Sequence, residues 1–260
     1  MNANQEARRL LHFEWKRYWP DMIISCLSAF FLGLLAVMPL IGQTDHGPFL
    51  FQMSIVEADN PVERHVTGLF LDIIFLGLFP LFVLVLTTRM PVSLVKTWEI
   101  YAQRLAVART MPLSTRGFVR ARTFQGITMV LLHFVVFFGT IYLVSQAAFV
   151  TLPFFTYLSF IAIWLGYSLA VGGWFIFMEW VSGKRSLFVH LGLYLAFVIG
   201  LIVFDMWRML SQMNSSLVDQ TIRLVNQYPW ISPLTLLFGC LVLFGWSLLI
   251  EKRLQTRELY

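Results

Sequence analysis

The sequence predicts an all-α protein that crosses a membrane six times. Of its 260 residues, 58% are hydrophobic and 13% are charged, and the mean hydropathy is +0.73. A soluble domain of this length needs far less apolar material to fill one core. Six stretches are long enough to cross a hydrocarbon core of about 30 Å as helices of roughly 20 residues. They are residues 22–42, 68–88, 124–146, 154–178, 187–207 and 231–250.

The basic residues predict the orientation of these spans. With the N-terminus in the cytoplasm, all but three of the 19 Lys and Arg residues fall in inside segments. The outside segments hold only Arg64, Arg208 and Arg223. The positive-inside rule therefore predicts a multi-pass protein of the cell membrane with both termini in the cytoplasm. Anionic lipid of the inner leaflet accounts for the net charge of +5, so no nucleic acid partner is needed.

The segment before the first span, residues 5–19, is expected to form an amphipathic helix at the membrane interface. Its basic residues stand among apolar and aromatic ones, which suits the boundary between headgroups and acyl chains. The side chains expected to act there are Arg8, Arg9, Trp15, Lys16, Arg17 and Trp19. The alternative is an ordinary basic flank of the first span.

A long basic segment, residues 89–122, separates the second and third spans and is expected in the cytoplasm. Residues 92–108 predict one amphipathic helix, because apolar residues recur at spacings of three and four. These residues are Leu94, Val95, Trp98, Tyr101, Ala102 and Leu105. Pro112 then ends this helix, and Ser114 can cap a second one. The second helix is expected to carry Arg116, Arg120 and Arg122 directly into the third span.

The external segment, residues 208–230, is predicted to hold one more amphipathic helix. Its expected apolar face consists of Leu217, Ile222, Leu224 and Val225. Pro229 and Pro233 are expected to end it and to begin the sixth span. Between the fourth and fifth spans, a nine-residue basic turn around Lys184 is expected. No internal repeat or flexible linker interrupts the chain, which is expected to be one domain over residues 1–260.

Motifs for enzymatic chemistry are absent from the sequence. It has no phosphate-binding loop, no H-E-x-x-H or G-x-S-x-G motif and no cysteine pair suited to redox work. We therefore predict no catalytic residue, no cofactor site and no metal site. Two ionisable residues inside predicted spans, Asp72 and His133, have two readings: part of a proton or ion relay, or polar side chains that face the bundle near helix ends.

Small residues and a proline inside the spans predict close helix packing. Gly166, Gly172 and Gly173 in the fourth span allow another helix to approach closely, although a flexible or substrate-lining role is the alternative. Pro80 is expected to kink or end the second span.

Several local patterns resemble one family. The first is the stretch from Glu99 to Pro112 with the Leu113, Ser114, Thr115 and Arg116 that follow it. The second consists of Tyr228, Pro229, Ile231, Ser232, Pro233 and Leu234 at the entry to the last span, and the third is the ending from Lys252 to Leu259. Together with the layout of spans, they make the chain similar to an ABC-2-type permease, the membrane subunit of a type V ABC exporter.

The resemblance implies a partner and a mode of coupling. A separate P-loop ATPase subunit would hold ATP and Mg, and a second permease copy or paralogue would help to enclose the translocation path. The coupling residues would be Trp98, Glu99, Ile100, Tyr101, Arg104, Leu105 and Arg109. In this reading, Glu99 and Arg104 make polar contacts, and Trp98, Ile100 and Tyr101 are apolar anchors.

Two other functions share parts of this pattern. A membrane regulatory or immunity subunit without transport activity would have the same topology. A membrane enzyme or ion-coupled carrier would need clustered acids, histidines or metal ligands, or inverted halves with broken helices, and the sequence shows neither.

Overall fold

The computed structural model describes residues 19, 22–37, 68–80, 114–147, 154–181, 184–212 and 216–257. These residues form helices and short connections, which confirms the all-α prediction for this part of the chain. The helices are Met22–Val37, residues 68–80 with the π-helix η2 at Ile73–Leu78, α6 at Thr115–Ala147, α7 at Phe154–Val181, α8 at Lys184–Gln212, α9 at Leu217–Gln227 and α10 at Ile231–Arg257.

Three helices within the described residues are long and apolar enough to cross a membrane. Their apolar segments are Thr115–Ser145 in α6, Phe154–Phe177 in α7 and Ile231–Gln255 in α10. Shorter apolar helices lie within the other three predicted spans, at Met22–Val37, Gly68–Leu78 and Gly192–Phe204. The structure is therefore compatible with a membrane location.

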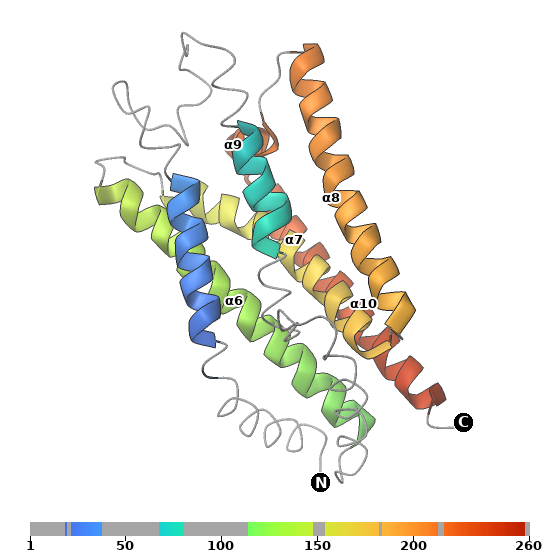
Figure 1. Cartoon of the computed structure of the whole chain (residues 1–260). Coiled ribbons are helices and arrows are strands. Elements are labelled where there is room, and N and C mark those ends of the chain that lie inside the picture. The colour runs from blue at the N-terminus through green and yellow to red at the C-terminus, as the bar shows by residue number, and fades with distance from the viewer. Residues whose placement is uncertain are drawn as a thin grey trace.

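The helices run in alternating directions, and their charge is unevenly distributed. Met22–Val37, α6 and α8 run one way, whereas α7 and α10 run the other (Figure 1). One end of the bundle therefore holds the first turns of α6 and α8 and the last turns of α10. This end carries Arg116, Lys184 and Lys252. Arg223 lies at the opposite end, in α9. Among the described residues, basic side chains therefore gather at one end of the bundle.

Glycines bring α7 and α10 into backbone contact. A Cβ atom added to Gly239 would overlap the backbone of Gly166, and one added to Gly166 would overlap the carbonyl group of Thr235. Farther along, a Cβ atom on Gly173 would come within 3.0 Å of the Leu243 Cα. Small residues permit this approach between apolar helices, where dispersion contacts favour association. The predicted packing role of Gly166 and Gly173 is confirmed, whereas Gly172 faces Val130 of α6.

The helix Met22–Val37 packs on α6 through a similar row of small residues. Ser25, Ala29 and Ala36 on this helix are each at most 1% exposed. A Cβ atom on Gly33 would come within 2.9 Å of both the Phe137 carbonyl oxygen and the Thr140 Cβ. The spacing of three and four residues aligns these positions on one helix face.

Two predicted connections differ in the structure. α7 continues to Val181 and α8 begins at Lys184, so the nine-residue turn does not form and Lys184 and Arg185 lie in the first turn of α8. α8 also continues to Gln212, beyond the predicted end of the fifth span. Hydropathy marks the limits of apolar sequence, whereas backbone hydrogen bonds extend a helix through polar residues.

Candidate functional site

The second predicted span contains a local change of helical register. Residues Ile73–Leu78 form a π-helix, and the Phe79 N–H donates to the Ile74 carbonyl, five residues back. Pro80 explains the change, because an α-helix would require its backbone N–H to reach the Leu76 carbonyl and proline has none. Single π-helical turns inside α-helices occur frequently at functional sites. The sequence predicted a kink or end at Pro80 but not this wider turn.

Pro80 leaves the Leu76 carbonyl without an α-helical partner, and tyrosines from two other helices donate hydrogen bonds to it. The Tyr167 hydroxyl of α7 donates to the Leu76 carbonyl oxygen at 3.0 Å. The Tyr194 hydroxyl of α8 lies 3.5 Å from the same oxygen. Neighbouring side chains commonly satisfy freed backbone groups in this way within membrane helices. The break thereby joins the helix 68–80, α7 and α8 at one point.

Asp72 lies one turn before Leu76 and holds the start of α9. Its two carboxylate oxygens accept hydrogen bonds from the backbone N–H groups of Leu217, at 3.0 Å, and Val218, at 2.9 Å. The first N–H groups of a helix lack partners within the helix, and the helix dipole favours negative charge there. Asp72 is 0% exposed, so its carboxylate is enclosed by the bundle and α9.

α9 packs onto the bundle with a face that differs from the prediction at Val218, which was not predicted, and at Leu224. Val218, Ile222 and Val225 are buried, at spacings of four and three that place them on one side of a helix. Leu224 is 37% exposed, so its predicted place on the apolar face was wrong. It lies about 100° around the helix from Val225, which turns it away from α7. α9 ends at Gln227, and Pro233 lies in the first turn of α10 as predicted.

His133 joins α6 to the helix Met22–Val37. The Ser25 hydroxyl lies 2.8 Å from its Nδ1 and 2.9 Å from its Nε2, and Nδ1 lies 3.2 Å from the Met129 carbonyl oxygen. One tautomer satisfies all groups: Nδ1–H donates to Met129, and Nε2 accepts from Ser25. Both side chains are buried. Within the described residues, Asp72 and His133 do not bond to each other: Asp72 accepts from α9, and His133 contacts Ser25.

Aromatic side chains surround the register change. Phe75 lies within the π-helix and contacts Phe137, Phe160 and Trp164 with ring centroids 5.0 to 5.7 Å apart. Phe79 contacts Phe137 at 4.4 Å and also lies beside His133. Edge-to-face and tilted arrangements of this kind add to the stability gained by burial. The Phe75 side chain is therefore held between α6 and α7.

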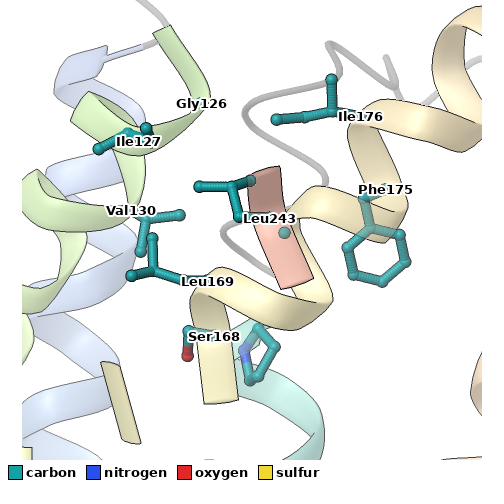
Figure 2. A pocket seen from close by; sticks show the side chains of 10 residues that line it. Gly126, Ile127, Val130, Ser168, Leu169, Phe175, Ile176 and Leu243 are labelled. Carbon is teal, nitrogen blue, oxygen red and sulfur yellow. The ribbon is translucent and has the colours of Figure 1, made fainter. Parts of the chain in front are cut away.

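A small apolar cavity lies beside Pro80, between α6, α7 and α10 (Figure 2). Its volume is about 20 Å³, which is room for about one water molecule. Gly126, Gly172 and Leu243 contribute to its lining together with Ser168, whose buried hydroxyl has no hydrogen-bond partner in the described part of the chain. This cavity cannot accommodate cargo larger than water.

The predicted second helix of the basic segment begins where the sequence indicated. The Ser114 hydroxyl accepts a hydrogen bond from the Gly117 N–H at 3.1 Å, which is a side-chain cap. α6 then runs without interruption from Thr115 through the third predicted span. Of the interfacial residues, only Trp19 is described, and it is 63% exposed. The other predicted interfacial residues and all seven predicted coupling residues, from Trp98 to Arg109, lie outside the described residues.

Together these features define an all-helical bundle compatible with a membrane, whose polar contacts tie helices together. Among the described side chains, no group of three or more His, Cys, Asp or Glu residues comes together that could hold a metal ion. The chain matches no protein-family model, and no curated protein or solved structure shows significant similarity to it.

Proposed function

We propose that this chain is the permease subunit of an ATP-driven ABC exporter. It would form the translocation path with a second copy or a paralogue and would couple to a separate ATPase subunit. ATP and Mg would be bound by that partner, so this chain would supply the path and not the chemistry. The support is the predicted layout of six spans, the resemblance of its local patterns to ABC-2-type permeases, and the geometry of α6.

α6 is the observation on which the proposal depends most. Its 33 residues extend for about 50 Å at a rise of about 1.5 Å per residue. A hydrocarbon core of about 30 Å leaves about 20 Å of helix outside it. The excess includes the basic turns with Arg116 and Arg120, directly after the predicted coupling segment. A helix that is rigid from a cytoplasmic contact to the far side of the bundle can act as a lever.

The contacts of α6 indicate which helices such a lever would move. His133 bonds to Ser25 of the first helix, and Phe137 packs against Phe75 and Phe79 beside the π-helix. When ATP binding closes the two nucleotide-binding subunits, the docked cytoplasmic segment would move with them. α6 would then tilt, and the first two spans would follow as packed bodies.

Two substitutions in the predicted coupling helix test this function. We expect Trp98→Ala with Glu99→Lys to weaken co-purification of the ATPase by about thirtyfold or more, because a buried aromatic anchor at an interface contributes about 2 kcal/mol. Membrane insertion should be unchanged. Trp230→Ala is the matched control, because this exposed tryptophan directly precedes α10, and the start of α10 and the start of α6 lie at opposite ends of the bundle (Figure 1).

The test has outcomes that separate the candidate functions. Unchanged ATPase binding and full stimulation of ATP hydrolysis by the double variant would refute the assignment of the coupling helix. A wild-type chain that binds the ATPase but gives no ATP-dependent export in vesicles would favour the regulatory subunit instead. A wild-type chain that captures no P-loop ATPase would refute the proposed function.

A further inference from the structure

α6 presents an exposed stripe that is basic at one end and apolar beyond it. Arg116 and Arg120 are exposed, and the exposed Phe124, Leu131 and Val135 follow on α6. These positions are spaced by four, four, seven and four residues, which aligns them along one helix face. From Phe124 to Val135 the stripe extends for about 16 Å, close to the roughly 15 Å thickness of one leaflet of the hydrocarbon core.

α10 has a matching stripe that runs in the opposite direction. Leu241, Phe244 and Leu248 are exposed and apolar, and the exposed Lys252 and Arg253 follow. Lys252 lies one turn beyond Leu248 on the same face. Each stripe therefore places cationic groups at one end, next to side chains that suit acyl chains.

The two basic ends adjoin each other. The Arg116 Nε of α6 lies 2.6 Å from the Glu251 Oε1 of α10, and the bond bridges the helices at this end of the bundle. We call Arg116, Arg120, Lys252 and Arg253 the basic collar. Glu251 pairs with Arg116, and the Gln255 amide also lies near the same carboxylate oxygen. Arg122 is buried beside Gln125 and is not part of the collar.

We propose that the basic collar binds the headgroup of an anionic phospholipid, with its acyl chains along the exposed stripes of α6 and α10. Guanidinium and ammonium groups donate charge-assisted hydrogen bonds to phosphate oxygens, and long basic side chains near helix ends reach the headgroup level. The apolar residues adjoin the collar at the depth of acyl chains, which favours a lipid over an acidic protein surface. The proposal requires a membrane location but does not depend on transport.

Native mass spectrometry of the full chain in detergent can test the site. Phosphatidylglycerol and phosphatidylcholine with identical acyl chains would be added at equal concentration, and the retained lipids counted. The wild-type chain should retain phosphatidylglycerol preferentially. Each basic residue near a membrane surface changes binding of anionic lipid by about fivefold. Replacement of Arg120, Lys252 and Arg253 by Gln should therefore reduce the preference by at least fivefold.

Two further variants separate a specific site from a general effect. Arg223→Gln removes an exposed charge at the opposite end and should leave the preference unchanged. Glu251→Gln frees Arg116 from its ion pair and should strengthen retention of phosphatidylglycerol, which a loss of folding could not do. The proposal would be overturned if the triple variant and the wild type showed equal preference, or if both lipids were lost equally. It would also be overturned if a collar variant lost an acidic protein partner while its lipid retention was unchanged.

Discussion

The bond between Asp72 and α9 gives a prediction that can be worked out from the structure. α9 has only 11 residues, and isolated helices of this length are marginal. It is held by its buried face and by the hydrogen bonds that two of its backbone N–H groups donate to the Asp72 carboxylate. Asp72→Asn keeps the shape of the side chain but removes the charge and presents an NH₂ group to one of these donors. We therefore expect the start of α9 to fray.

The expected magnitude follows from the two hydrogen bonds. A hydrogen bond to a charged group contributes about 1.5 to 3 kcal/mol, and the variant loses one such bond and weakens the other. A loss of about 2 kcal/mol corresponds to an opening equilibrium about thirtyfold larger. Hydrogen exchange of the amides of Leu217 and Val218, measured by mass spectrometry in detergent, should accelerate by about that factor. Exchange within α10 should remain unchanged.

A matched variant and a clear negative result make this test decisive. Glu251→Gln also removes one acidic charge, but its partner Arg116 has a side chain 66% exposed, and surface ion pairs contribute little. Its effect on exchange in α9 should be negligible. If Asp72→Asn leaves the protection of Leu217 and Val218 as it is in the wild type, then the carboxylate does not hold α9 and the reasoning fails.

Two further substitutions address the helix contacts. Gly239→Ala should lower stability in detergent by about 1 to 3 kcal/mol, because the added methyl group overlaps backbone. Gly245→Ala, with open space around it, should not; equal thermal midpoints of the two variants would contradict the backbone contact between α7 and α10. Tyr167→Phe leaves the Leu76 carbonyl with only the longer contact and should cost about 1 kcal/mol. The exposed Tyr228→Phe is its control, and an equal effect of both would show that the hydroxyl of Tyr167 is dispensable.

Features that depend on nearby residues could be predicted from the sequence. Ser114 and Pro112 indicated the start of α6 because caps and breaks act within a single turn. The glycines of the fourth span indicated a close helix contact, since a missing side chain permits approach from any direction. They did not reveal that α10 would be the partner, because that choice depends on the arrangement of all the helices.

The polar contacts of the second span could be predicted only in part. Proline removes the donor for the carbonyl four residues earlier, and Pro80 accordingly predicted a kink or an end of the span. The choice of Tyr167 and Tyr194 depends on helix rotation, which hydropathy does not determine. Asp72 was identified as an intramembrane polar group, but its partners are backbone atoms of a segment far along the chain. Backbone donors are present at every residue except proline and give no signal in the sequence.

The backbone contact between α7 and α10 at Gly166, Gly173 and Gly239, which we call the glycine seam, has a consequence for biosynthesis. A ribosome makes α7 well before α10, so in a membrane Gly166 and Gly173 would enter the bilayer before the helix that covers them. During that interval the bare backbone of α7 can meet only lipid or other early helices, and close contact must await the last span. Late completion of the seam makes α10 the element that commits the bundle to its final packing. A nascent chain arrested before Ile231 should therefore remain loosely packed, however well its earlier helices have inserted.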